Sequence, residues 1–321
     1  MRVLITGING MDGSYLAELM LAEGHEVWGT IRRNSVSENQ TTRINHILPK
    51  ITRRYADLLD FPSIHKVIAE CDPHEIYHVA AQSHVRVSFD VPSYTMNTII
   101  QGTLNIFESV KLVDKYIRIY NAGSSEMFGN SVDSDGFSRE TTPMNPVSPY
   151  GIAKHAAFNL GKMYRDSYDM FICNGILFNH EADRRGANFV TAKIVNGAYD
   201  IAQGKADTLN LGNLQASRDW GHAKDYCKGM HLMLGQEVPG DYVLASGETH
   251  TVEYFADLVF RKFGLDYQDY VKIAPEYFRP NELHSLKGDA SKARSDLGWS
   301  PEYSFEGLVD DMIEHKNNEK N

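Results

Sequence analysis

The first thirteen residues constrain the fold of this chain more than any other stretch. Residues 2–6 (RVLIT) form a short apolar run of the kind found in strands that are buried on both faces. Gly7, Gly10 and Gly13 follow at three-residue steps, and residues 14–25 have the pattern of an amphipathic helix. A strand, a glycine turn and a helix in this order form a dinucleotide-binding unit, because the glycines let the backbone approach a pyrophosphate at the helix N-terminus.

Strand and helix patterns alternate strictly beyond this unit. Strands are expected near residues 26–33, 51–58, 75–81 and 116–123, with helices between them. This alternation predicts an α/β fold with a Rossmann-type, doubly wound parallel sheet, whose ligands lie at the C-terminal ends of the strands. A smaller, mixed α/β C-terminal substrate domain is expected to complete the fold.

The chain is long enough, at 321 residues, for one large and one small domain. It contains no internal repeat, no low-complexity tract and no clean linker, so we expect it to cross between the two domains more than once. The predicted cofactor domain comprises residues 1–176 and a returning segment near 213–244. The predicted substrate domain comprises residues 177–212 and 245–321.

The end of the second strand favours NADP over NAD. An NAD enzyme places an acidic residue there to hold the ribose diol, whereas this chain has Arg32 and Arg33. Guanidinium groups bind a 2′-phosphate that a carboxylate would repel. Further along, Asp57 and Leu58 are expected to contact the adenine, and the turn at 82–83 is expected to form another loop on the cofactor side.

A helix that begins near residue 149 carries a candidate acid–base pair. Ser148 is the predicted N-cap and Pro149 the first helical residue, so Tyr150 and Lys154 lie one turn apart on one face. A phenol has an ordinary pKa of about 10, so it needs a neighbouring ammonium group to act as a base at neutral pH. This spacing also arises by chance, so the pair gains its meaning from the cofactor unit upstream.

The strand before this helix ends in polar side chains. Ser124, Ser125 and Glu126 follow the apolar run directly. A hydroxyl beside Tyr150 could share a substrate proton, and Glu126 adds a second acid–base group. The sequence therefore predicts a redox step at a carbinol together with a separate proton abstraction.

Overall charge and composition exclude several other classes. The net charge is -10 and no long basic run occurs, which argues against nucleic-acid and membrane-surface binding. The three cysteines lie far apart and match no metal or disulfide spacing, so no metal site is expected. Because the chain begins with a strand and lacks a signal peptide or a long apolar run, we expect a cytoplasmic protein. Cations scattered beyond residue 177 in this acidic chain suit a diphosphate ligand.

Several motifs resemble a known family. GINGMDG, SSEMFG and SPYGIAK resemble the extended short-chain dehydrogenase/reductases. NGILFNHE, RRGANFVT and RDWGHAKDY are similar to the GDP-mannose 4,6-dehydratase family within that class, and the likeness covers essentially the whole chain. Two departures stand out: Ser124 occupies a position where the family usually has threonine, and the chain has NHEAD where NHES is usual.

The resemblance implies roles for three sets of residues. The NADP contacts would be Gly7, Asn9, Gly10, Met11, Asp12, Gly13, Arg32, Arg33, Asn34, Ser35, Asp57, Leu58, Val79, Ala80, Ala81, Gln82, Ser83, Tyr94, Lys154, His180 and Arg185. The catalytic set would be Ser124, Glu126, Tyr150 and Lys154. The GDP-sugar would be bound by Ser83, Ser125, Asn179, Val190, Lys193, Arg218, Arg279 and Glu282.

The resemblance also implies a reaction. GDP-D-mannose would become GDP-4-dehydro-6-deoxy-D-mannose plus water, by internal hydride transfer from C4 to C6 through tightly bound NADP. Tyr150, its pKa lowered by Lys154 and the cofactor charge, would take the C4 hydroxyl proton, and Glu126 would take the C5 proton. An NADP-dependent epimerase or 4-keto-sugar reductase is the alternative, since it needs no Glu126. A non-catalytic NADP-sensing scaffold protein is a more remote one.

A homo-oligomer, either a tetramer or a dimer, is the expected assembly. Residues 34–48 are polar at their start, and we expect them to project as an arm over the cofactor phosphate or against a neighbouring subunit. The family resemblance places the RRNS loop at the neighbouring subunit's cofactor site.

Overall fold

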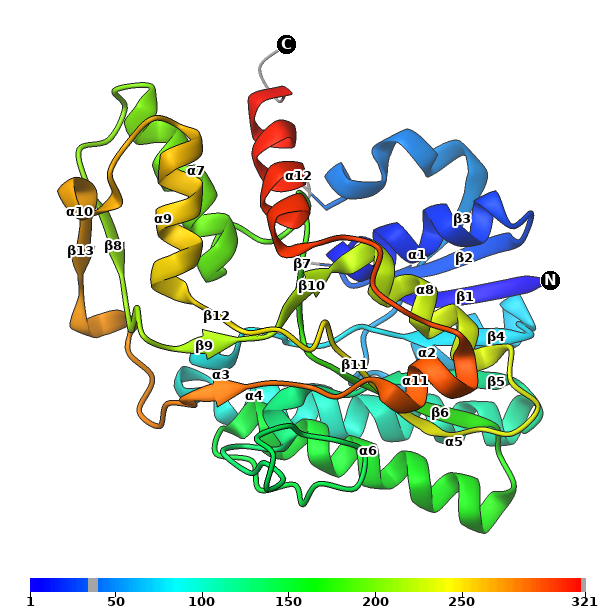
Figure 1. Cartoon of the computed structure of the whole chain (residues 1–321). Coiled ribbons are helices and arrows are strands. Elements are labelled where there is room, and N and C mark those ends of the chain that lie inside the picture. The colour runs from blue at the N-terminus through cyan, green and yellow to red at the C-terminus, as the bar shows by residue number, and fades with distance from the viewer. Residues whose placement is uncertain (34–39, 319–321) are drawn as a thin grey trace.

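A seven-stranded parallel sheet organises the molecule (Figure 1), as the alternating sequence pattern predicts. The computed structural model describes residues 1–33 and 40–318. The strands are, in spatial order, β3 (Ile51–Tyr55), β2 (Glu26–Ile31), β1 (Arg2–Thr6), β4 (Glu75–His78), β5 (Arg118–Ala122), β6 (Ile172–Leu177) and β11 (Asp241–Leu244). All neighbouring pairs are parallel, and the order reverses between β1 and β4. This is the switch point at which doubly wound sheets bind their ligands.

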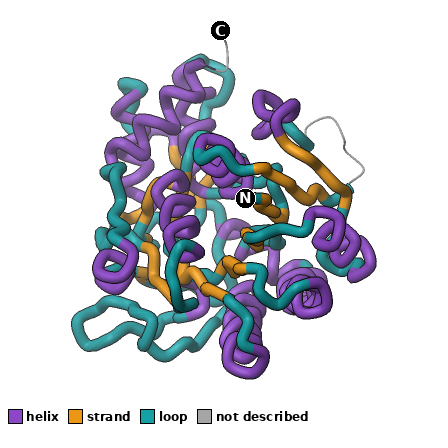
Figure 2. Tube along the Cα trace, turned by 90° about the vertical axis from the view of Figure 1, so that its right-hand side faces the viewer, coloured by secondary structure: helices purple, strands orange, loops and turns teal. Residues whose placement is uncertain are grey.

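Helices cover both faces of this sheet, with the strands running through the middle (Figure 2). Side chains that alternate along β1 point to opposite faces of the sheet, and each face has its own core cluster: Val3 and Ile5 belong to one cluster and Leu4 to the other. The first cluster includes side chains of α1 (Met11–Ala22) and α8 (Ala223–Leu234). The second includes side chains of α2 (Phe61–Cys71), α5 (Gly102–Val113) and α6 (Pro149–Tyr168).

A smaller unit with its own core lies beyond the strand ends, at the upper left of Figure 1. Three helices surround this core: α7 (Val190–Ala202), α9 (Val252–Lys262) and α12 (Phe305–Asn318). Short strands pair around it: β8 (Leu209–Leu211) with β13 (Val271–Ile273), and β9 (Ser217–Arg218) with β12 (His250–Thr251) and β14 (Ser285–Leu286). Between the two units, β7 (Asn179–Glu181) pairs with β10 (Trp220–His222).

The chain passes between the two units several times. After β10 it returns through α8 and β11 to the large sheet, and it then enters α9 of the smaller unit. Later, α11 (Ser291–Leu297) packs its Ala293 and Leu297 into the core of the large sheet.

Part of the polar segment after β2 packs against the large sheet and its helices, whereas its sequence predicts a projecting arm. Residues from Thr42 to Lys50 form the 3-10 helix η1, and the side chains of Ile44 and Ile47 are buried in the core beside α1. The prediction of a projecting arm is therefore wrong for this part, because two apolar side chains three residues apart anchor it. Residues 34–39, which include the predicted contacts Asn34 and Ser35, lie outside the described residues.

Several short helices complete the fold. They are α3 (Val85–Asp90), α4 (Pro92–Met96), the π turn η2 (Asn97–Gln101), η3 (Ser125–Met127), α10 (Tyr267–Tyr270) and η4 (Pro275–Tyr277). Among the helices of residues 1–33 and 40–318, none has the length and apolar character needed to cross a lipid bilayer.

Candidate active site

A cavity of about 720 Å³ opens at the C-terminal edge of the large sheet, where the smaller unit faces it. Its volume is in the range of small-molecule sites. It is lined by all four predicted catalytic residues, all eight predicted substrate contacts and every described predicted cofactor contact except Arg33. Arg33 is exposed and lies outside the lining. Residues spread from the first turn to position 282 thus meet in one place.

The glycine turn after β1 forms one wall of this cavity. Gly7 has a φ of 68°, a left-handed conformation that favours glycine. A Cβ atom at Gly13 would lie 2.3 Å from the carbonyl oxygen of Gly7, so no side chain fits there. The turn leads directly into α1, and this cradle fits a pyrophosphate at the helix N-terminus.

Arg32 directly follows β2 and lines the cavity. Its guanidinium group donates a hydrogen bond to the Tyr94 hydroxyl, and its Cζ lies 5.8 Å from the centre of the Tyr94 ring. The arginine is thereby held beside α4 while it remains exposed. Its charge is available to an anionic ligand.

The start of α6 has the predicted local structure. The Ser148 hydroxyl accepts a hydrogen bond from the backbone N–H of Gly151 at 3.0 Å, and Pro149 begins the helix. Gly151 lets α6 approach η3 closely, since a Cβ atom there would lie 2.7 Å from the carbonyl oxygen of Glu126. This close packing places Tyr150 beside the end of β5.

Burial dominates the acid–base chemistry of the Tyr–Lys pair. It raises the pKa of Tyr150 to about 12, although a hydrogen bond with Ser124 acts in the opposite direction. It also lowers the pKa of Lys154 to about 8, against the opposing effect of the Asp12 carboxylate. The Lys154 ammonium donates a hydrogen bond to the carbonyl oxygen of Ala122 at 2.6 Å and lies 6.0 Å from the centre of the Tyr150 ring. In the protein chain by itself, burial thus sets the direction of the Tyr150 pKa shift, and the lowering expected from Lys154 together with the cofactor charge stays a prediction.

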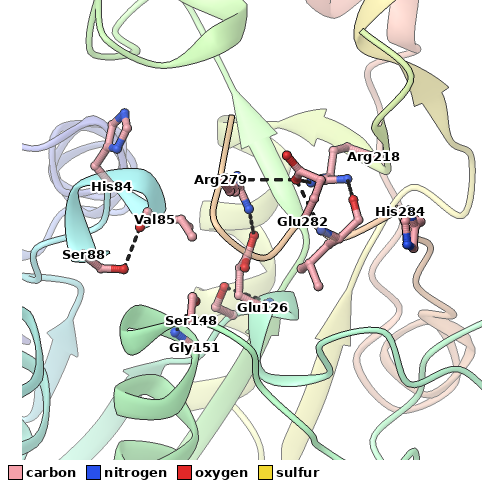
Figure 3. Close-up of polar contacts among 12 residues, drawn as sticks. His84, Val85, Ser88, Glu126, Ser148, Gly151, Arg218, Arg279, Glu282 and His284 are labelled. Atoms are coloured by element: carbon pink, nitrogen blue, oxygen red, sulfur yellow. Dashed lines mark hydrogen bonds and ion pairs between the residues drawn. The ribbon is translucent and has the colours of Figure 1, made fainter. Parts of the chain in front are cut away.

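Glu126 lies at one end of a chain of charged side chains (Figure 3). Its Oε1 accepts a hydrogen bond from Arg279 Nη1 at 2.9 Å. Its Oε2 is buried and has no hydrogen-bond partner within the described part of the chain. Beyond Arg279, the Glu282 carboxylate lies 3.8 Å from Arg279 Nε and accepts a hydrogen bond from Arg218 Nη2 at 3.1 Å. One oxygen of the Glu126 carboxylate is therefore held by Arg279, while the other is buried without a hydrogen bond in the described chain.

A second buried ion pair joins the glycine turn to β7. Asp12 Oδ2 lies 3.1 Å from His180 Nε2, and the carbonyl oxygen of Phe178 lies 2.8 Å from Nδ1 of the same ring. Burial alone would lower the pKa of His180, but these two acceptors raise it above the ordinary value. Burial would likewise raise the pKa of Asp12, but His180 holds it below the ordinary value. The Asp12 carboxylate of this pair is also the group that raises the pKa of Lys154 against burial.

Arg185 is held in place from two sides. Its Nε lies 2.8 Å from the buried Glu181 carboxylate, and its Cζ lies 3.7 Å from the centre of the Phe189 ring. Phe189 in turn packs against His84, with ring centres 4.9 Å apart. This stack connects the loop after β4 with the loop before α7.

Sequence reasoning left four notable lining residues out of the predicted site: Arg43, His84, Phe189 and Tyr277. Arg43 donates a hydrogen bond to the carbonyl oxygen of Arg184 at 2.8 Å. Arg43 lies in the segment that the sequence predicts to project, and no motif in that segment indicates that it lines the cavity. Tyr277 stacks under Lys193, whose Nζ lies 3.3 Å from the ring centre. His84 directly follows the predicted cofactor contacts Gln82 and Ser83 in the sequence, and could have been found from them.

The doubly wound sheet, with a Tyr–Lys pair on a helix beside its strand ends, defines an enzyme of the extended short-chain dehydrogenase/reductase class. The family model described as GDP-mannose 4,6 dehydratase matches residues 4–312, and this chain belongs to that family. The resemblance found in the sequence is confirmed.

Close relatives agree with this placement. GDP-mannose 4,6 dehydratase 2 of Arabidopsis thaliana is 50% identical, over 97% of this chain and 85% of that protein. GDP-mannose 4,6-dehydratase of Vibrio cholerae is 40% identical, over 97% of this chain and 92% of that protein.

Solved structures share the fold at lower identity. UDP-glucose 4-epimerase of Thermus thermophilus, in complex with NAD, superposes with a TM-score of 0.87 at 24% identity over 99% of each chain. The dTDP-glucose 4,6-dehydratase of Bacillus anthracis, in complex with NAD, gives 0.86 at 21% identity over 100% of this chain and 98% of that one.

Proposed function

We propose that this protein converts GDP-D-mannose into GDP-4-dehydro-6-deoxy-D-mannose and water. Membership of the family supports this reaction. The observation that carries it is Glu126, a buried carboxylate that lines the same cavity as Tyr150 and has its Oε2 without a partner in the described chain. A simple reductase needs the Tyr–Lys pair alone, whereas the loss of water needs a base for the C5 proton.

We propose NADP as the resident cofactor. The glycine turn would hold its pyrophosphate, and Arg32 beside Tyr94 would pair with a 2′-phosphate. Lys154, His180 and the predicted residues of the turns after β3 and β4 would hold the remainder. The chemistry that NADP would supply when bound is hydride exchange within one sugar, from C4 to C6, with no net change in the oxidation state of the cofactor.

Tyr150 would take the proton of the C4 hydroxyl. Because burial raises its pKa to about 12, the tyrosine needs positive charge beside it to act near neutral pH. Protonated Lys154 and the oxidised nicotinamide ring would together supply that charge. The Ser124 hydroxyl would stabilise the phenolate by a hydrogen bond, and so would do what threonine does in most of the family.

Glu126 would carry out the dehydration. A ketone at C4 makes the C5 hydrogen acidic, and Glu126 would take it as a proton. The C6–O bond then breaks, and the leaving hydroxyl would become water with the proton that Tyr150 took from the C4 hydroxyl. After the hydride reaches C6, Glu126 would return its proton to C5, which restores both side chains to their starting states.

The test is a direct incubation of the protein with NADP and GDP-mannose. Mass spectrometry should find a product lighter by one water, with no net NADPH absorbance. Glu126→Gln should still bind NADP but should lose turnover by about 10²–10⁴-fold, the usual contribution of such a base. Glu237→Gln, an exposed carboxylate outside the cavity lining, is the matched control and should keep full activity. No mass change with the wild type, or normal turnover by Glu126→Gln, would refute the proposal.

Three organisational predictions remain proposals. The division into a cofactor domain and a GDP-sugar-binding domain is supported by the two separate core clusters, with α11 packed on the larger one. A homo-oligomer, either a tetramer or a dimer, is proposed from the family resemblance alone. A reducing, cytoplasmic location is supported by three free, buried cysteines. Light scattering would measure the oligomeric state.

A further inference from the structure

The ion pair between Glu126 and Arg279 conflicts with the role of Glu126 as a base. A carboxylate that must remove a proton from carbon works best without a cation bound to it. Here Arg279 Nη1 lies 2.9 Å from Oε1, and the two residues are 153 positions apart in the sequence. The pair is therefore a tertiary contact that the fold builds between the large sheet and the segment before β14 (Figure 3).

Arg279 is not committed to Glu126 alone. The Glu282 carboxylate lies 3.8 Å from its Nε, so the guanidinium group stands between two carboxylates. Its side chain is 23% exposed, whereas that of Glu126 is 7% exposed. Arg279 can therefore turn toward the cavity while Glu126 stays fixed on η3.

The charges around Arg279 favour a movement of its side chain away from Glu126 and toward an anionic ligand. The Arg218 guanidinium group is almost fully buried beside Arg279, and the nearness of Arg279 contributes, after burial, to lowering the pKa of Arg218. Two neighbouring cations attract a diphosphate, which carries more negative charge than one carboxylate. Tyr150 from α6 and Arg218 also interact electrostatically with Glu126, and neither forms an ion pair with it.

We propose that Arg279 has two alternative anionic partners, the Glu126 carboxylate and the diphosphate of the sugar nucleotide, and that exchange from the first to the second releases Glu126 to act as the base. This inference rests on the proposed function. Arg279 is then a positioning residue that couples recognition of the nucleotide to proton abstraction several bonds away. Binding energy from a remote part of the substrate would be used at the reacting carbon.

The test divides the substrate into two pieces. The NADP-loaded protein is incubated in D2O with free 4-dehydro-6-deoxy-mannose, which has the acidic C5 hydrogen but no diphosphate, and GDP is supplied separately. Exchange of the C5 proton for deuterium is followed by NMR. With the wild type, GDP should speed this exchange by about tenfold or more, the bias that an adjacent opposite charge typically gives.

Variants separate this role from simple substrate binding. Arg279→Gln should exchange the C5 proton without GDP at the rate that the wild type reaches with GDP. Arg279→Lys keeps the charge and should keep the dependence on GDP. Arg261→Gln is the matched control, because this exposed arginine lies on α9, pairs with Asp257 and is absent from the cavity lining. It should behave as the wild type does.

A second measurement does not depend on turnover. Infrared difference spectra of the wild type against Glu126→Gln identify the carboxylate stretch of Glu126. This band should shift when GDP is added to the wild type and should stay fixed in Arg279→Gln. A wild-type exchange rate that GDP does not change, or a carboxylate band that GDP does not shift, would overturn the proposal.

The same experiment distinguishes the failure of this inference from the failure of the proposed function. Exchange at C5 of intact GDP-4-dehydro-6-deoxy-mannose, lost in Glu126→Gln, reports on the base itself. If that exchange is present while GDP has no effect on the fragment, only the role of Arg279 is wrong. If that exchange is absent, the proposed function is wrong and the role of Arg279 is wrong with it.

Discussion

Replacement of Gly151 by alanine should impair catalysis without unfolding the protein. An ideal Cβ at this position would lie 2.7 Å from the carbonyl oxygen of Glu126, whereas ordinary contacts begin at 3.4 Å. The N-terminus of α6 must therefore move away from η3 by roughly 0.7 Å, the difference between these distances. A displacement of about 1 Å in an active site costs on the order of 10²-fold in rate, so we expect kcat to fall by roughly 10- to 100-fold.

The stability of the same variant should change little. Alanine favours the helix over glycine by about 1 kcal/mol, and the forced separation costs about 1–3 kcal/mol, so the net loss should stay within about 2 kcal/mol. The assay is steady-state dehydration of GDP-mannose together with urea unfolding. Gly235→Ala is the control, because its Cβ would meet the carbonyl oxygen of Leu232 at an ordinary 3.5 Å. If Gly151→Ala kept kcat within threefold of the wild type, close packing of α6 on η3 would not be what aligns Tyr150 with Glu126.

Three further predictions follow from the charges in the cavity. Because Lys154 keeps its proton only below a pKa of about 8, the rate of dehydration should fall as the pH rises through 8. Lys154→Arg should remove this alkaline loss. A pH–rate profile that is the same in Lys154→Arg and the wild type would count against the role of the Lys154 charge. Asp12→Asn removes the anion that raises the pKa of His180, so NMR of the imidazole should find its titration at lower pH, and an unshifted titration would contradict the pairing. Arg32→Ala should weaken the binding of NADP by about 1.5–3 kcal/mol in fluorescence titrations and leave the binding of NAD unchanged. Equal weakening of NADP and NAD binding would refute the assignment of Arg32 to the 2′-phosphate.

Those parts of the site that depend on local sequence could be predicted. The glycine turn, the N-cap at Ser148 and the Tyr150–Lys154 spacing are each set within a few residues, and the alternation of strands and helices places them at one edge of a parallel sheet. Glu126 comes four residues after the end of the buried strand β5, so its position at that edge was equally accessible.

Contacts between distant residues could not be predicted in the same way. Asp12 and His180 are 168 positions apart, and neither residue has a local pattern that specifies the other. In the chain by itself, burial raises the pKa of Tyr150, a shift that the local sequence does not indicate, because desolvation depends on packing from several elements at once. The Glu126–Arg279 pair depends on a loop of the smaller unit and has no periodic signal at all.

The central claim is that hydride moves from C4 to C6 of one sugar while Glu126 moves the C5 proton. Turnover of GDP-mannose that carries deuterium at C4 tests this most directly, with NMR of the product and absorbance at the wavelength of NADPH. The account predicts a product that has lost one water and holds the deuterium at C6, with no net NADPH. Deuterium found in the solvent or in a released pool of NADPH, or a product that still holds its C6 oxygen, would contradict it.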